Sequence, residues 1–408
     1  MFCGRCSGAT MGTTLHGAGA GVAERELARL GWVALALTPE MGPTRIAKAM
    51  ARLGAAERVF EASLTELEGA GLPARSAQFV FEGRAHEAAE NEAKRVAETG
   101  GTFLTREDAA YPERLLEIYD PPAVLWIRGD ATVLARPAIA VVGTRQPSPY
   151  GAGMAEMLSR DLANRRLVIV SGMARGVDSA AHKGALDAGG KTVAVWGTGI
   201  DVVCPKENKK LAERSVESGG TIVSEFPLGT FPAPQNFPLR NRILSGMSVG
   251  VLVVEAGEYS GTRITARCAM EQNRDVYAVP GNVTNKNAWG PNTLIKQGAK
   301  LTATWEDVWE DLSSEVKREL EEAMEVVGEI ESKAGGAASL FNDGEETLPE
   351  QERVVLNRLR RDESIQLDEL IEGLESQVGS AEIFAALFEL ELRRRVKQLP
   401  GKNYVRCF

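Results

Sequence analysis

Six short apolar runs, most of them ending in glycine or a charged residue, decide the fold of this chain. They are Ala138-Ile-Ala-Val-Val-Gly143, Leu167-Val-Ile-Val-Ser-Gly172, Thr192-Val-Ala-Val-Trp-Gly197, Thr221-Ile-Val-Ser224, Val249-Gly-Val-Leu-Val-Val-Glu255 and Asp275-Val-Tyr-Ala-Val-Pro280. Their β-branched, nearly uninterrupted apolar character is typical of strands covered on both faces. Segments with helical periodicity, such as residues 150–164 and 262–272, separate them. This alternation predicts an α/β domain with a doubly wound, mostly parallel sheet.

The rest of the chain is organised around this Rossmann-like sheet. We expect a disordered extension at residues 1–21, a helical domain at 22–100, the Rossmann-like domain at 102–312, a charged helix and linker at 313–346, and a winged-helix domain at 347–408. In the helical domain, a Gly42-Pro43 turn opens a helix marked by Ile46 and Met50. This turn is similar to that of SAM-like and helix-hairpin-helix domains, although an ordinary helical bundle explains it better.

Three helical periods followed by a hairpin pattern predict the winged helix. The helices are expected at residues 350–360, 366–374 and 381–392, and an extended segment with a Pro400-Gly401 turn follows them. The third helix carries Glu382, Glu389 and Glu391, which would repel the phosphates of a DNA groove. We therefore interpret the module as a protein-contact or self-association domain, with Phe384, Leu387 and Phe388 on the buried face of that helix.

Composition and charge restrict the possible partners. The 408 residues carry a formal net charge of −9, so any nucleic acid must be bound at a local basic patch. Apolar segments long enough to cross a bilayer are absent from the sequence, as is a secretory signal, so we expect a cytoplasmic protein without membrane contact. The five cysteines do not form a disulfide framework, and the single pair Cys3 and Cys6 is too few for a zinc site.

Glycines and cations follow the strand ends, where doubly wound sheets bind ligands. We predict a binding site for a phosphate chain made of Gly143, Arg145, Ser171, Gly172, Arg175, Lys206, Arg240, Asn241, Arg242 and Arg263. Glycines let the backbone approach a ligand closely, and the cations provide the attraction. We expect about two of the six cations to be structural and to pair with Asp178, Glu225 or Glu255.

Known cofactor and catalytic motifs are missing from the strand ends. The turn after residue 143 lacks the G-x-G-x-x-G fingerprint of dinucleotide sites, and the chain has no P-loop. His182 lies four residues after Asp178, which we expect to orient the imidazole or to cap the helix. We therefore predict a non-enzymatic protein with no catalytic residues, no cofactor and no metal.

Several motifs occur in one order between Tyr111 and Leu301 and together resemble the DprA/Smf (DNA-processing protein A) family. They include Val141-Val-Gly-Thr-Arg145, Ser171-Gly-Met-Ala-Arg-Gly-Val-Asp178, Arg240-Asn-Arg-Ile243, Ala278-Val-Pro-Gly281 and Leu294-Ile-Lys-Gln-Gly-Ala299. The resemblance implies sequence-independent binding and protection of single-stranded DNA in natural transformation. It also implies loading of the RecA recombinase and a homodimer formed through the Rossmann-like domain.

The resemblance carries family positions onto particular residues of this chain. The DNA pocket of the family falls on Gly143, Arg145 and Lys206. Cys204 stands where the family has an aromatic residue, which leaves Phe237 and Tyr259 as the candidates for an aromatic surface. Arg263 also departs from the family pattern, in which that position is aliphatic.

A nucleotide-processing hydrolase is the alternative function. Lysine-decarboxylase-like phosphoribohydrolases share a Rossmann-like core, but they carry a P-G-G-x-G-T-x-x-E loop. In this chain Pro280-Gly281 continues as Asn-Val-Thr-Asn, so the loop is missing.

Overall fold

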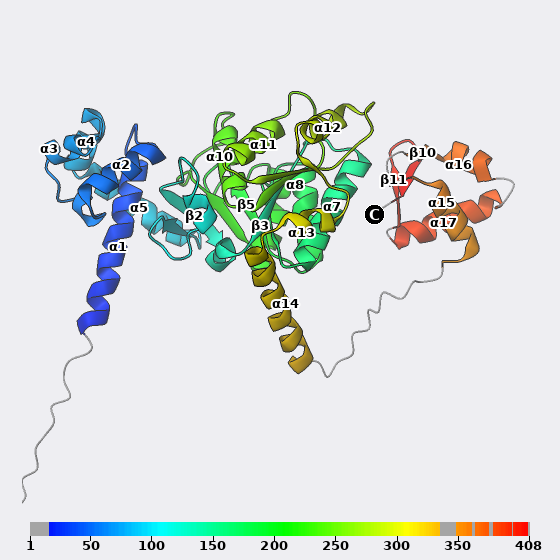
Figure 1. The fold of residues 1–408 in the computed structure, drawn as a ribbon, viewed down its shortest axis with the longest axis horizontal. Helices are drawn as coiled ribbons and strands as arrows, with labels where there is room; N and C mark the ends of the chain where they lie inside the picture. The colour runs from blue at the N-terminus through cyan, green and yellow to red at the C-terminus, as the bar shows by residue number, and fades with distance from the viewer. Residues whose placement is uncertain (1–15, 335–347, 361–363, 375–377, 394, 407–408) are drawn as a thin grey trace, which may run out of the picture. The chain divides into compact units, whose positions relative to one another are not determined.

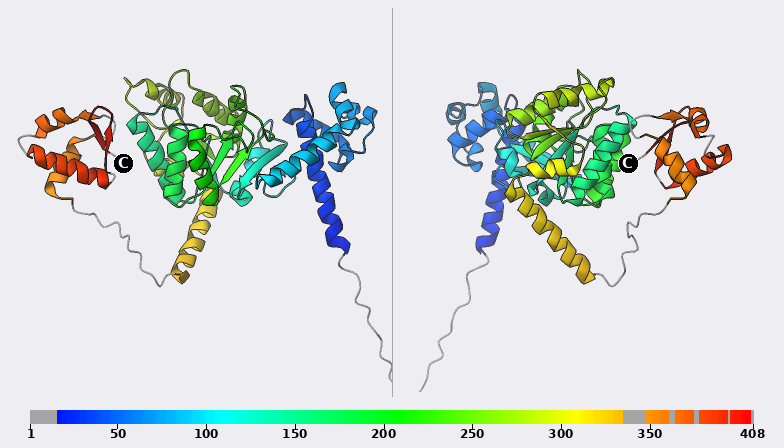
Figure 2. Two further views of the ribbon diagram at one scale, coloured as in Figure 1. Left: turned by 180° about the vertical axis from the view of Figure 1, so that it is seen from behind. Right: turned by 45° about the vertical axis from the view of Figure 1, so that its right-hand side comes forward.

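The computed structural model describes residues 16–334, 348–360, 364–374, 378–393 and 395–406. The chain divides into two compact units. One consists of Met1–Asp108 with Tyr119–Leu125, and the other of Ala109–Ile118 with Trp126–Phe408. Figures 1 and 2 show the course of the chain.

The first unit is helical. Its helices are α1 (His16–Leu37), α2 (Pro43–Leu53), α3 (Leu64–Gly69), α4 (Ala74–Phe81) and α5 (Arg84–Glu98), with a 3₁₀ turn at Glu57–Val59. As expected from the Gly42-Pro43 turn, α2 begins at Pro43. The helix buries Ile46 and Met50. The extension expected at residues 1–21 is wrong for its last part, because α1 begins at His16. Residues 1–15, with Cys3 and Cys6, lie outside the described residues.

The central sheet has nine strands in the order β1-β2-β6-β5-β4-β3-β7-β8-β9. The strands are β1 (Thr102–Thr105), β2 (Val124–Gly129), β3 (Ala138–Val142), β4 (Val168–Ser171), β5 (Thr192–Trp196), β6 (Thr221–Ser224), β7 (Gly250–Val253), β8 (Asp275–Ala278) and β9 (Lys300–Leu301). The pairs from β6 to β9 are parallel, whereas β2 runs antiparallel to β6. The predicted mostly parallel sheet is therefore confirmed.

All six predicted strands are present, and β3 to β7 are buried along their whole length because helices cover both faces. The helices of this domain are α6 (Glu113–Leu116), α7 (Pro149–Asn164), α8 (Val177–Asp187), α9 (Lys209–Glu217), α10 (Asn236–Gly246), α11 (Thr262–Glu271), α12 (Trp289–Lys296), α13 (Trp305–Asp311) and α14 (Ser314–Ala334). Helices α7 and α8 pack together in one layer, and α10 and α11 pack together in the other (Figure 1).

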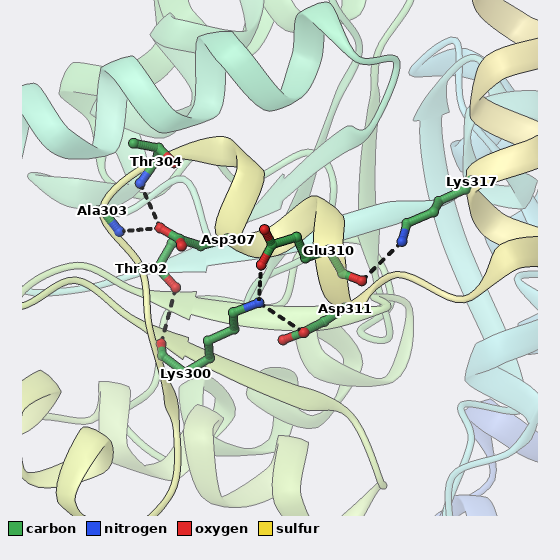
Figure 3. Close-up of polar contacts among 8 residues, drawn as sticks. All are labelled: Lys300, Thr302, Ala303, Thr304, Asp307, Glu310, Asp311 and Lys317. Atoms are coloured by element: carbon green, nitrogen blue, oxygen red, sulfur yellow. Dashed lines mark hydrogen bonds and ion pairs between the residues drawn. The ribbon is translucent and has the colours of Figure 1, made fainter.

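The edge of the sheet at β9 is tied to α13 by charged and polar contacts (Figure 3). Lys300 Nζ lies 3.3 Å from a carboxylate oxygen of Glu310 and 2.9 Å from one of Asp311. Thr304 and Asp307 form a capping box that begins the helix. These contacts hold a strand of only two residues, whose length explains why the sequence pattern did not predict it.

The C-terminal domain is a winged helix, as predicted. It consists of α15 (Glu350–Arg358), β10 (Ile365–Gln366), α16 (Leu367–Leu374), α17 (Ser380–Leu392), β11 (Val396–Leu399) and β12 (Asn403–Arg406). The predicted buried face of α17 is partly wrong. Leu387 is buried, but Phe384 and Phe388 are 49% and 61% exposed. Ile383 and Leu390 complete the core instead, because the helix is rotated relative to the face that we expected.

No helix in the described part of the chain combines the length and apolar character needed to cross a membrane. Within the same residues, His, Cys, Asp and Glu side chains do not gather into a group of three that would hold a metal ion.

His182 is a fully buried histidine of α8, and its surroundings fix its neutral form. Its Nδ1 lies 2.6 Å from Thr192 Oγ1, which itself donates to the carbonyl of Ile169. Nδ1 must therefore carry the proton, while Nε2 has no hydrogen-bond partner among the described residues. Burial, together with the nearby positive charge of Arg240, lowers the pKa of His182 to about 3.

We predict that this histidine makes the folded state less stable in acid. Between about pH 3 and pH 6.5 the unfolded chain binds a proton at His182 that the folded chain does not. The free energy of unfolding therefore decreases as the pH is lowered through this range. From pH 7 to pH 5 the loss amounts to about 2 kcal/mol. Urea titrations of the wild type and His182→Gln at both pH values measure it, since the variant lacks this dependence. Parallel pH profiles for the two proteins would contradict the assignment.

Candidate functional site

The strand order reverses direction between β3 and β7, and a cleft opens at the carboxyl ends of these two strands. Such a switch point is the usual ligand site of a doubly wound sheet. The cleft has a volume of about 920 Å³, at the upper end of the range for ligand pockets. The loop after β3 contributes residues 143–146, and the loop after β7 contributes residues 257–262.

Glu255 joins the two loops that form the cleft. Its backbone carbonyl accepts a 2.6 Å hydrogen bond from the amide of Thr144. Its carboxylate accepts bonds of 2.9 Å from the amide and 2.6 Å from the hydroxyl of Ser148, just before α7. The glutamate is only 2% exposed, so these bonds are made away from water. Because of them, the β3 and β7 loops keep a fixed relative position. Glu255 pairs with none of the predicted cations in the described contacts.

Arg240 lies beneath the cleft with little of its surface exposed. It is 6% exposed, and its Nη1 donates a hydrogen bond to the carbonyl of Val195. Burial lowers the pKa of Arg240 to about 10, while the nearby carboxylate of Asp178 opposes this shift. Burial likewise raises the pKa of Asp178, and the charge of Arg240 partly offsets the increase. The charges of Arg240 and Asp178 therefore stabilise each other, and Arg240 is one of the cations that we expected to be structural.

Gly172 is needed for this arrangement, because an added Cβ atom would lie 2.1 Å from Arg240 Nη1. Its amide and that of Ala174 donate to Asp178 Oδ2 at 3.1 and 3.2 Å. The expectation that Asp178 orients His182 is wrong, since the imidazole bonds to Thr192. Asp178 instead holds the loop that precedes α8.

Two further residues of the predicted site are buried outside the lining of the cleft. Both carboxylate oxygens of Glu225 lie 2.6 Å from Arg242 Nη2, and this arginine is 9% exposed. Arg242 is thus the second structural cation. Ser171 is fully buried and donates a 2.7 Å hydrogen bond to the carbonyl of Val141. Neither residue lines the cleft.

Four predicted cations remain exposed. Arg145 lines the cleft, with its guanidinium carbon 5.6 Å from the centre of the Phe237 ring. Arg175 also lines it and forms a 2.5 Å ion pair with Glu207, in which both side chains are 62% exposed. Such a surface pair contributes little stability and opens easily. Lys206 and Arg263 are exposed but lie outside the cleft lining.

Arg263 donates a 2.8 Å hydrogen bond to the carbonyl of Glu258 and lies over the Trp289 ring, 5.2 Å from its centre. Of the remaining predicted residues, Gly143 and Asn241 line the cleft. The structure thus brings five of the ten predicted site residues to one cleft: Gly143, Arg145, Arg175, Arg240 and Asn241.

Sequence reasoning missed several polar residues of the cleft. Gln146, Thr262 and Asn287 line it. Asn287 Nδ2 donates a 3.0 Å hydrogen bond to the carbonyl of Gln146, and so joins the segment after β8 to the β3 loop. The three asparagines at positions 282, 285 and 287 were the available signal, because polar residues after a strand end favour a site.

The fold and the cleft together define a class of protein. It is a Rossmann-like α/β protein whose strand-end cleft is polar and lined by arginines, and whose first strand is not followed by the dinucleotide-binding motif. A family model for DNA recombination-mediator protein A matches residues 102–313, and one for the DprA winged helix domain matches residues 342–402. The chain belongs to the DprA/Smf family.

Individual relatives agree with this assignment. Protein Smf of Escherichia coli is 45% identical over 206 residues, which cover 50% of this chain and 55% of that protein. Protein Smf of Synechocystis is 32% identical and covers 74% of this chain and 80% of its own length. The X-ray structure of DNA processing protein A from Streptococcus pneumoniae, 35% identical, superposes with a TM-score of 0.61 over 70% of this chain and 98% of that one.

We predict that Arg240 stabilises the fold, whereas Arg145 does not. Arg240→Met leaves Asp178 buried without a counter-charge and should lower the free energy of unfolding by about 3–5 kcal/mol. Arg145→Gln, at an exposed position, should change it by less than about 0.5 kcal/mol. Urea denaturation measures both. Adding Asp178→Asn to Arg240→Met should restore part of the loss, since the unpaired charge is then gone. An unchanged midpoint for Arg240→Met would refute the structural role.

Proposed function

We propose that this protein binds single-stranded DNA without regard to sequence and protects it during natural transformation. The observation that carries the proposal is the cleft at the β3/β7 switch point, where Arg145 and Arg175 lie beside glycine-rich loops. Exposed guanidinium groups suit the phosphate chain of a nucleic acid, and the glycines of these loops let that chain approach the backbone. Family membership supports the same function, because relatives carry the name DNA processing protein.

Binding is local on this acidic molecule. The chain has a net charge of −9, so a phosphate chain is repelled over most of the surface and attracted where cations are exposed together. We propose Gly143, Arg145, Arg175, Lys206, Asn241 and Arg263 as the DNA-contacting residues. Ser171, Gly172, Arg240 and Arg242 belong to the support of the site, given their burial and their packing or bonding partners.

The proposed role extends to partners and location. We propose a cytoplasmic, non-enzymatic protein that helps to load the RecA recombinase and forms a homodimer through the Rossmann-like domain. The domain plan inferred from the sequence, with an N-terminal helical domain up to residue 100 and a winged helix from residue 347, fits a binding protein of several modules. For the winged helix, the carboxylates of α17 favour a protein contact over DNA.

We predict that Arg145 contributes one phosphate contact. Arg145→Gln should weaken oligo-dT binding about tenfold and reduce the slope of log K against log salt by about 0.7, the value for one contact with a single strand. Fluorescence anisotropy at two or more salt concentrations measures both quantities. Arg318→Gln, which removes a 73% exposed arginine of α14, is the matched control and should bind as the wild type does.

Two outcomes would oppose this function. If Arg145→Glu bound oligo-dT with undiminished affinity, the cleft would not be the DNA site. If incubation with nucleoside monophosphates released free base, the hydrolase alternative would replace the binding function.

A further inference from the structure

We propose that Tyr259 stacks on an unpaired nucleobase and gives the cleft its preference for single-stranded over double-stranded DNA. The inference rests on the proposed function and adds a residue that contacts the bases of the strand, whereas the arginines contact its phosphates. Phosphate contacts alone would not favour the single strand, because a duplex carries the same phosphate groups at a higher charge density.

Tyr259 is almost fully exposed at the edge of the cleft. The residue is 93% accessible, although it lines the cleft. Aromatic rings usually gain stability by leaving water, and a buried tyrosine usually finds a hydrogen-bond partner as well. No hydrogen bond or ring contact joins this ring to another residue in the described ranges. The folded chain thus leaves both faces of the ring open for a planar partner.

The backbone that carries Tyr259 is firmly held. The amide of Ser260 donates a 3.1 Å hydrogen bond to the carbonyl of Gly257 and closes a tight turn around the tyrosine. The side chain of Arg263 donates to the carbonyl of Glu258. On the strand side, the amide of Ala256 donates a 2.7 Å hydrogen bond to the carbonyl of Asn287. An exposed ring on a fixed turn presents a stacking surface at low conformational cost.

Other aromatic residues near the cleft are less suited to this role. One face of Phe237 already lies under the guanidinium of Arg145, and the ring is half-buried. Trp289 lies under Arg263 and does not line the cleft. Phe231 is 77% exposed but likewise does not line it. Within the described residues, Tyr259 alone among the aromatic side chains combines a place in the lining with an unoccupied ring.

The positively charged group and the aromatic ring come from opposite loops of the cleft. Arg145 belongs to the loop after β3 and Tyr259 to the loop after β7, and Glu255 fixes the separation of these loops. A strand with its phosphates at Arg145 can turn a base toward the β7 loop if that base is unpaired. In a duplex the base is already stacked and paired, and it must leave that position first. Stacking accepts any base, which agrees with binding that ignores sequence.

The test compares oligo-dT with an abasic oligomer of the same length, which keeps the phosphates and lacks the bases. Tyr259→Leu should weaken oligo-dT binding roughly 5- to 150-fold, the range for loss of one stacked base. It should weaken binding of the abasic oligomer less than about twofold. Tyr259→Phe keeps the ring and should bind both ligands as the wild type does. Tyr119→Leu, at an 89% exposed tyrosine of the other unit, is the control and should change neither affinity.

Two results would overturn the inference. The first is a Tyr259→Leu variant with wild-type affinity for oligo-dT. The second is an equal loss on both oligomers, which would mean that the tyrosine contacts phosphate or supports the loop. A wild-type protein that binds neither oligomer would instead refute the proposed function itself. Duplex DNA provides the last comparison: the ratio of single- to double-strand affinity should fall in Tyr259→Leu and stay unchanged in Tyr119→Leu.

Discussion

The buried carboxylate of Glu255 is the interaction on which the arrangement of the cleft depends. It lies just after β7, and it accepts hydrogen bonds from the segment that follows β3. These strands are neighbours at the point where the sheet order reverses, so without such a bond their loops would diverge in solvent. Gly151 lies against the same carboxylate, at a distance that excludes a side chain. A single buried residue thus sets the width of the cleft and the start of α7.

The cations of the strand ends divide into two groups with different roles. Arg240 and Arg242 are buried beside Asp178 and Glu225, and they maintain the loops from below. Arg145 and Arg175 are exposed in the cleft, where a phosphate can contact Arg145 and can replace Glu207 as the surface partner of Arg175. The division reconciles a net charge of −9 with nucleic-acid binding, because only a small surface has to be positive.

The sequence was sufficient to predict most of the sheet but not the roles of individual arginines. Runs such as residues 138–143 are buried on both faces, so their composition reveals the strands. Short edge strands such as β9 carry too few residues for a pattern. Arg240 and Arg242 are buried and Arg145 is exposed, although all three stand beside similarly polar neighbours in the sequence, and only tertiary packing decides which arginines are buried. The exposed face of α17 was misjudged for a similar reason, because several rotations of an apolar helix satisfy the same periodicity.

The central claim is that single-stranded DNA lies in the switch-point cleft between the β3 and β7 loops. A crystal structure of the chain with a short oligo-dT tests it directly. The account predicts phosphates within hydrogen-bond distance of Arg145 and a base against the ring of Tyr259. DNA bound only at the winged helix or at the N-terminal helical unit, with the cleft empty, would contradict it.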